Sequence, residues 1–173
     1  MKLFIDADSF PYRDSIYAIC NKFDLECISV CDNTRKFPKK ATSLRRGGRV
    51  YCYKYQSIIV PRAKHAADNK IYEMATSGDI ILTNDTRLAT KCRCDKNAFV
   101  LNMAGHLYSR SRKLNRLYDK KYQRFKAPLD SFESVLQETI VYAMGQPEIN
   151  TLESQYRAKK LDSVLKRRFH NHL

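Results

Sequence analysis

The sequence predicts an α/β fold with a mainly parallel sheet, followed by helices at the C-terminal end. Short apolar runs at Leu3–Ile5, Ile80–Leu82 and Ala98–Leu101 are typical of buried parallel strands. Apolar residues at helical spacing lie between such runs, as the crossover connections of a parallel sheet require. Glycine and proline occur only five times each, which argues against a loop-rich or all-β design.

The composition describes a basic globular protein of 173 residues, enough for one compact domain and a helical appendage. The formal net charge of +14 favours a polyanionic partner, with nucleic acid ahead of an anionic membrane surface. No stretch has the roughly 18–20 apolar residues of a membrane span. Asp6 interrupts the apolar N-terminal run, unlike a signal peptide. We therefore expect a cytoplasmic protein that does not enter a membrane.

The first part of the chain predicts a strand that ends at Asp6 and a helix whose start is marked by Ser9 and Pro11. A second strand is expected over 25–31. Residues 32–48 are rich in lysine and arginine and are expected to form a basic loop or short helix at the surface. This segment is either an ordinary solvated stretch or a contact for phosphates.

The middle of the chain predicts further strands alternating with helices. Strand-like alternation over 50–60 precedes a helix over 63–76, which Gly78 is expected to end. A strand over 79–83 then leads into another helix, and the last strand is expected over 98–101. Polar residues follow these strands and repeat the order of strand, polar tip and helix seen at the N-terminus.

The C-terminal part predicts helices without strands. Basic residues with interleaved tyrosines fill 109–126, and apolar residues at helical spacing occupy 129–144 and 151–169. We place an α/β domain at 1–126. A basic helical extension at 127–173 then packs on the domain or projects from it.

The six cysteines are expected to be mostly buried thiols in a reducing compartment. Cys20 lies on an apolar helical stripe, and Cys27 and Cys31 lie in a strand-like run. Cys92 and Cys94 are too close together for the usual spacing of a structural zinc site. The chain is also unlike the short secreted proteins that disulfides hold together.

Four aspartates carry the predicted chemistry: Asp6 and Asp8 after the first strand, Asp85 after a later one, and Asp68 at a helix start. Carboxyl ends of parallel strands meet at one edge of a sheet, so these carboxylates should gather and need a cation. Oxygen ligands suit Mg²⁺ or Mn²⁺, and such a metal in a basic protein predicts phosphodiester hydrolysis. The simpler alternatives are that Asp8 or Ser9 caps a helix and that Asp68 complements a helix dipole.

Supporting polar residues are expected at the same edge. Thr83 and Asn84 can hold a metal-bound water or a carboxylate in place, or else form a turn cap. His65 and Asn102 complete this set. The residues expected to bind nucleic acid are Arg35, Lys36, Lys39, Lys40, Arg45, Arg46, Arg110, Arg112, Lys113, Arg116, Lys120, Lys121 and Arg124.

Three segments carry a family resemblance. Ile5–Pro11, His65–Ile71 and Gly78–Ala89 are similar, in order and spacing, to the D-A-D-x-x-P, D-x-A-D-x-x-I and G-D-x-V-I-T-x-D-x-x-L-A segments of the bacterial YaiI/YqxD family of PIN-like proteins. The resemblance covers residues 1–108. It implies a three-layer α/β/α PIN-like fold and a ribonuclease that depends on Mg²⁺ or Mn²⁺, with the four aspartates as its acidic cluster.

The chain departs from the family pattern at several positions. His65 stands where the family usually has an acid, and Met103-Ala104 replaces an expected proline-arginine pair. The basic region after residue 145 resembles an added element that grips nucleic acid. These departures leave the activity of the metal site open.

We therefore predict a metal-dependent nuclease, with RNA favoured as the substrate and a protein partner or second copy left open. The alternative is a nucleic-acid-binding module with a degenerate catalytic site, such as a ribonucleoprotein subunit. A phosphatase of the haloacid-dehalogenase type, with Asp6 as nucleophile, is a third hypothesis. Ser9-Phe10 and the position of Gly78-Asp79 before its strand fit that class poorly.

Overall fold

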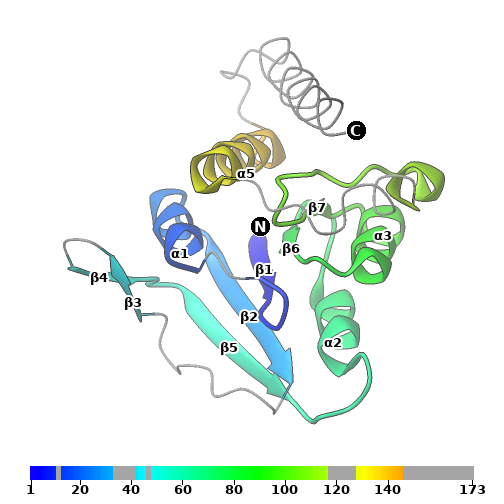
Figure 1. Cartoon of the computed structure of the whole chain (residues 1–173), viewed down its shortest axis with the longest axis horizontal. Coiled ribbons are helices and arrows are strands. Elements are labelled where there is room, and N and C mark those ends of the chain that lie inside the picture. Colours follow the sequence, from blue (N-terminus) through cyan, green and yellow to red (C-terminus); the bar gives the residue numbers. More distant parts are fainter. Residues whose placement is uncertain (11–12, 33–41, 46–47, 117–127, 146–173) are drawn as a thin grey trace, which may run out of the picture.

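A five-stranded sheet, with all strands parallel, forms the centre of the molecule (Figure 1). The computed structural model describes residues 1–10, 13–32, 42–45, 48–116 and 128–145. The strand order is β5-β2-β1-β6-β7. The strands are β1 (Lys2–Asp6), β2 (Glu26–Asp32), β5 (Tyr55–Val60), β6 (Ile80–Leu82) and β7 (Phe99–Leu101).

Strand β1 is apolar throughout its interior because neighbouring strands cover both its edges and helices cover both its faces. Phe4 pairs with Ile28 of β2 and with Ile81 of β6, so β1 is hydrogen-bonded along both edges. Leu3, Phe4 and Ile5 have no exposed surface. A strand in this position needs apolar side chains on both faces, which explains the continuous run in the sequence.

Helices cover the two faces of the sheet and produce three layers. Helices α1 (Arg13–Lys22) and α5 (Leu129–Ala143) pack on the face that carries Leu3 and Ile5. Helices α2 (Ala66–Met74) and α3 (Thr86–Asp95) pack on the opposite face, and Figure 1 shows them side by side. The predicted α/β fold with a parallel sheet and a C-terminal helix is confirmed.

An antiparallel hairpin corrects one prediction. Strands β3 (Thr42–Arg45) and β4 (Gly48–Tyr51) pair, with Leu44 opposite Arg49, where a basic loop or short helix was expected. Threonine, valine and tyrosine favour extended backbone here, although the many basic residues obscure the pattern. A turn at Tyr53-Lys54 also divides the strand expected over 50–60 into β4 and β5.

The end of α2 corrects a second prediction. The helix ends at a C-cap, Ala75, whose backbone is extended, so Gly78 does not end it. Instead, the Asp79 carboxylate accepts hydrogen bonds from the backbone N–H of Thr76 at 2.9 Å and from its hydroxyl at 2.8 Å. Gly78 lies within the turn that Asp79 closes and has a φ of +84°, a conformation that favours glycine.

Several predicted segments fall outside the described residues: the helix start at Pro11, most of the basic stretch over 32–48, residues 117–127 and the last helix over 151–169. Within the described part of the chain, no helix combines the length and the apolar character that crossing a membrane requires.

Candidate active site

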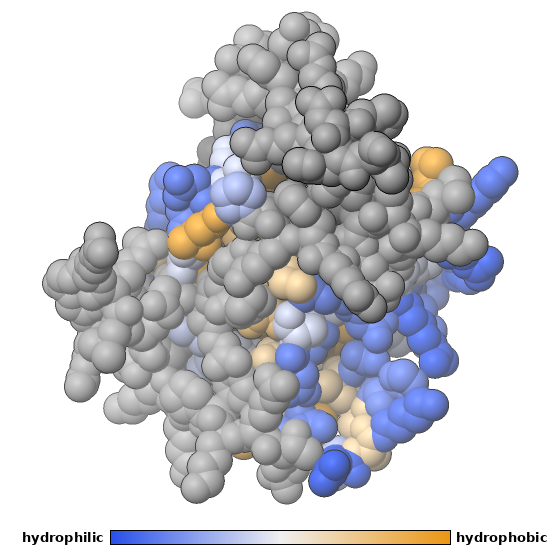
Figure 2. Space-filling model, viewed as in Figure 1, coloured by the Kyte–Doolittle hydropathy of each residue, from blue (hydrophilic) through white to orange (hydrophobic). Residues whose placement is uncertain are grey.

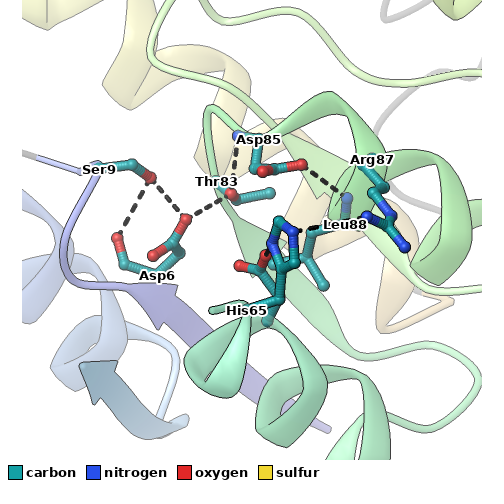
Figure 3. A network of polar contacts seen from close by, with 8 residues as sticks. Asp6, Ser9, His65, Thr83, Asp85, Arg87 and Leu88 are labelled. Carbon is teal, nitrogen blue, oxygen red and sulfur yellow. Dashed lines mark hydrogen bonds and ion pairs between the residues drawn. The ribbon is translucent and has the colours of Figure 1, made fainter. Parts of the chain in front are cut away.

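The candidate site lies at the edge of the sheet where β1 and β6 end and where α2 and α3 begin (Figure 3). Asp6 is the last residue of β1, and Thr83 directly follows β6. His65 is the N-cap of α2, and Asp85 is the N-cap of α3. The parallel topology therefore brings polar residues from four separate elements to one edge.

The Asp6 carboxylate is buried and held by two hydroxyl groups. Only 5% of Asp6 is exposed. Its Oδ2 atom accepts a hydrogen bond from the Ser9 hydroxyl at 2.7 Å and another from the Thr83 hydroxyl at 2.7 Å (Figure 3). Both hydrogen bonds from described residues reach Oδ2, which leaves Oδ1 as the oxygen available to a cation.

The pKa of Asp6 is raised above its usual range, mainly because burial disfavours the charged carboxylate. The hydrogen bonds from Thr83 and Ser9 oppose this shift. The negative charges of Asp68 and Asp8 raise the pKa further, so both carboxylates lie close enough to repel Asp6. A bound cation at this edge would relieve the repulsion.

Asp8 and Asp68 also have partners within the protein. Asp8 Oδ2 accepts a hydrogen bond from the backbone N–H of Asp32 at 3.3 Å, which ties the turn after β1 to the end of β2. Asp68 Oδ2 lies 3.0 Å from His65 Nδ1. The side chains of Asp68 and His65 are 22% and 35% exposed.

His65 connects this acidic group to a basic residue. Its Nδ1 faces Asp68, while its Nε2 lies 3.5 Å from Arg87 Nη1 (Figure 3). The tautomer with hydrogen on Nδ1 satisfies both contacts, because Nε2 then accepts from the guanidinium. His65 has a φ of +62°, which is uncommon for a residue other than glycine. His65 therefore pairs with one predicted metal ligand, Asp68.

Asp85 caps helix α3. Its carboxylate accepts a hydrogen bond from the backbone N–H of Leu88 at 2.9 Å, and its own N–H donates to the Thr83 hydroxyl at 3.0 Å. The Thr83 hydroxyl therefore accepts from Asp85 and donates to Asp6, and so it aligns the two aspartates.

Two asparagines hold the loops around the site. Asn84 Nδ2 donates to the carbonyl of Ser9 at 2.6 Å, and Asn84 Oδ1 accepts from the N–H of Met103 at 3.0 Å. Asn102 Oδ1 accepts from the backbone N–H groups of Ala104 and His106, each at 3.0 Å. Asn84 thus joins the loops that follow β1, β6 and β7, whereas Asn102 shapes the turn after β7.

The donor set suits a hydrated hard cation. Among the described residues, no group of three or more histidine, cysteine, aspartate or glutamate side chains is placed to enclose a metal ion. Mg²⁺, however, keeps several waters and binds proteins through one or two carboxylates. The available Oδ1 of Asp6 and the neighbouring Asp8 carboxylate fit such an ion, as does the absence of thiols among the residues gathered here.

The predicted nucleic-acid-binding residues that the structure describes lie away from this site. Arg112 Nη2 pairs with Asp95 Oδ1 at 3.1 Å, at the end of α3 remote from Asp85, and Arg110 contacts Asn97. Lys113 and Arg116 follow in the same segment. The backbone of Arg45 is in β3; the remaining predicted positions, outside the described residues, are Arg35, Lys36, Lys39, Lys40, Arg46, Lys120, Lys121 and Arg124.

Three basic residues close to the aspartates were not predicted. Arg62 and Lys64 are exposed in the connection from β5 to α2, and Arg87 is exposed in the first turn of α3. Figure 2 shows mainly hydrophilic side chains over the α2–α3 side of the molecule. Their position in the sequence is the signal for them: Arg62 and Lys64 lie within a strand-to-helix connection, and Arg87 lies just after one, at the edge that carries the aspartates.

Comparison with known proteins identifies the family. The DUF188 family model, described as "Uncharacterized BCR, YaiI/YqxD family", matches residues 4–167. The chain belongs to the YaiI/YqxD family. The match includes all the described aspartates of the site and helix α5.

Relatives with the family name UPF0178 support this membership. The UPF0178 protein of Alkaliphilus metalliredigens is 33% identical over 129 residues, which cover 75% of this chain and 74% of the relative. UPF0178 protein DP1304 of Desulfotalea psychrophila is 25% identical over 169 residues, or 96% of this chain and 99% of the relative. No solved structure matches the chain significantly.

Proposed function

We propose that this protein is a divalent-metal-dependent nuclease that cleaves phosphodiester bonds in RNA at the carboxyl edge of its sheet. The observation that carries the proposal is the environment of Asp6. This carboxylate is 5% exposed, is oriented by Ser9 and Thr83, and is repelled by Asp8 and Asp68. Burying one carboxylate beside two others is costly, and binding a cation offsets that cost.

Some residues of the site would bind the metal, and others position these metal ligands. Asp6 and Asp8 would hold Mg²⁺ or Mn²⁺, which activates water and neutralises charge on a phosphodiester when bound. Ser9 and Thr83 fix the orientation of Asp6 through Oδ2. Asn84 fixes the loops that carry these residues, so the carboxylates stay in place before any ligand binds.

The positive charge needed to attract RNA lies beside the carboxylates. Arg62, Lys64 and Arg87 are exposed at the same edge of the sheet. Contact with His65 holds the Arg87 guanidinium next to the acidic group, where it can bind a phosphate oxygen. The formal net charge of +14 strengthens attraction of a polyanion to the whole molecule. RNA bound at this edge would pass over α3 toward Arg110 and Arg112.

A second candidate function is RNA binding without cleavage. It is favoured by the partners of two predicted metal ligands: Asp68 pairs with His65, and Asp85 caps α3. Because of those contacts, fewer carboxylate oxygens are available to surround a metal ion. On this alternative, the basic residues bind RNA and the aspartates have structural roles.

Cleavage of labelled RNA in Mg²⁺ or Mn²⁺ by the purified full chain tests the proposal. We expect cleavage that chelation abolishes and that Asp6→Asn lowers by about 100-fold or more, beyond the roughly 10–100-fold typical of a supporting residue. Asp24→Asn is the matched control, because the Asp24 side chain is 81% exposed and pairs with Lys54 at the surface. RNA that is bound but not cut in either metal would overturn the nuclease proposal and favour the second candidate.

A further inference from the structure

Three cysteines gather on the face of the sheet that α1 and α5 cover. Cys20 of α1, Cys27 of β2 and Cys52, between β4 and β5, belong to one hydrophobic cluster together with Leu3 and Ile5. Cys20 and Cys27 have no exposed surface, whereas Cys52 is 8% exposed. All three are free thiols, and the proposed nuclease site uses none of them.

Backbone contacts join the three chain segments around these thiols. The N–H of Leu25 donates to the carbonyl of Cys20 at 2.9 Å, and the N–H of Cys27 donates to the carbonyl of Lys54 at 2.8 Å. The N–H of Tyr53 donates to Asn21 Oδ1 at 3.1 Å. The turn that carries Cys52 is therefore fastened both to the end of α1 and to the start of β2. Within this arrangement, the three thiols lie close enough together to change one another's acidity.

The three thiols differ in acidity and in access to solvent. Interaction with the thiol of Cys20, and then with that of Cys27, lowers the pKa of Cys52, against the effect of burial. The pKa values of Cys20 and Cys27 are raised. A thiolate is the reactive form of cysteine, and Cys52 is also the member of the trio that reaches the surface.

The other described cysteines lack this combination. Burial raises the pKa of Cys92 to about 12, so its thiol stays protonated. The Cys31 thiol has no exposed surface and points at the carbonyl of Ile58, 4.0 Å away. Cys94 is only partly buried and donates to the carbonyl of Arg110 at 3.2 Å. Cys94 therefore serves as a partly exposed reference thiol in the same chain.

We propose that Cys52 and Cys20 form a reversible disulfide when the protein meets hydrogen peroxide. The Cys52 thiolate attacks one peroxide oxygen, the O–O bond breaks, and the released hydroxide takes up a proton to leave as water. The sulfur of Cys20 then attacks the resulting Cys52 sulfenic acid. An S–S bond forms, the S–O bond breaks, and the hydroxyl leaves as water with the Cys20 proton. In total, two thiols are oxidised and one peroxide is reduced to two waters.

Cys20, rather than Cys27, is the partner because its backbone is easier to move. A disulfide needs close approach of both Cβ atoms, which commonly requires a small backbone shift. Cys27 lies in β2, which is hydrogen-bonded to β1 on one side and to β5 on the other. Cys20 lies near the end of α1, outside the sheet, where its carbonyl accepts one backbone hydrogen bond, from the N–H of Leu25. The disulfide would fix the segment after β4 to α1.

Peptide mapping tests both the reaction and the pairing. The full chain is treated with hydrogen peroxide, quenched, denatured and alkylated, and then digested with trypsin. Cys20 falls in the tryptic peptide 14–22, Cys52 in 50–54, and Cys27 with Cys31 in 23–35. We expect the free thiols to fall from six to four, a linked pair of peptides 14–22 and 50–54, and recovery of all six after dithiothreitol.

Matched cysteine-to-serine variants test which thiols form the link. Cys27→Ser should still form the link, whereas Cys20→Ser should not, and Cys94→Ser should behave like the parent chain. Mapping the unmodified protein decides the question even if a variant fails to fold. A link between 23–35 and 50–54, or six thiols that survive peroxide, would overturn the proposal, as would sulfinic acid on Cys52 without a link.

Discussion

The charge of the buried Asp6 carboxylate opposes folding. Burial and the charges of Asp68 and Asp8 raise its pKa in the folded protein above the ordinary value of 3.8. The folded state therefore binds the proton more tightly than the unfolded state does. The resulting stabilisation is complete below about pH 3.8 and is lost as the pH rises through the raised pKa. At neutral pH, the ionised carboxylate lowers the stability of the metal-free protein.

Replacing Asp6 with asparagine should therefore stabilise the metal-free protein. The amide of the Asp6→Asn variant keeps an acceptor for Ser9 and Thr83 but removes the buried charge. We expect the free energy of unfolding at pH 7 to rise by about 1 kcal/mol, which raises Tm by about 2–4 °C. Thermal unfolding in a chelator measures the change, with Asp24→Asn as the control of equal charge. A fall in Tm at pH 7 would show that the charge of Asp6 does not burden the fold.

Asn84 connects three loops of the site. Asn84→Ala removes its side-chain hydrogen bonds to the Ser9 carbonyl and the Met103 N–H. Leaving the backbone partners unsatisfied should cost about 1–3 kcal/mol. Urea unfolding measures this loss, and Asn69→Ala, at an exposed position of α2, is the control and should be nearly neutral. Equal stability of the two variants would contradict the bridging role of Asn84.

The helices and strands differ in how clearly the sequence predicts them. Strand β1 is predictable because both its faces and both its edges are buried, which leaves a continuous apolar run. The hairpin of β3 and β4 is not, because its basic residues hide the extended pattern. Gly78 has the residue type of a helix terminus, but Asp79 closes the turn there instead.

The contacts of the site also differ in how clearly the sequence predicts them. Asp6 and Asp68 come together because a parallel sheet brings its strand ends to one edge, and this follows from the order of elements alone. The contact between His65 and Arg87 joins two helix starts that are 22 positions apart. It depends on how α2 and α3 pack, and a single sequence carries no pattern that reports such packing.

Helix α5 supplies part of the core that β1 needs. Its residues Phe132, Leu136 and Ile140 are fully buried and cluster with Leu3 and Ile5. We expect Leu136→Ala to destabilise the protein by about 2–5 kcal/mol, because it leaves a cavity in the layer between α5 and the sheet. Leu129→Ala, at the 42% exposed start of the same helix, is the matched control. Denaturant unfolding compares the two, and a loss below that of Leu129→Ala would mean that α5 is dispensable to this core.

Positive charge is abundant in the chain, and among the described residues only part of it lies near the carboxylates. Arg62, Lys64 and Arg87 occupy the edge where the parallel strands end. Lys2, Lys22 and Lys54 lie toward the edge where the strands begin, and each has a nearby partner: Glu26, Gln137 and Asp24 respectively. The two sets carry the same formal charge, so they separate local binding of RNA from general attraction.

Neutralising the set near the carboxylates should change how RNA binding depends on salt. Each contact between a cationic side chain and a phosphate of single-stranded nucleic acid contributes about 0.7 to the slope of log K against log salt concentration. The triple variant Arg62→Gln, Lys64→Gln, Arg87→Gln should therefore reduce this slope by about 2. Lys2→Gln, Lys22→Gln, Lys54→Gln should leave it almost unchanged. Titrations of labelled RNA in a chelator at several salt concentrations give both slopes without any cleavage. If the two variants lose affinity equally, net charge alone governs binding, and the edge beside Asp6 is not where RNA docks.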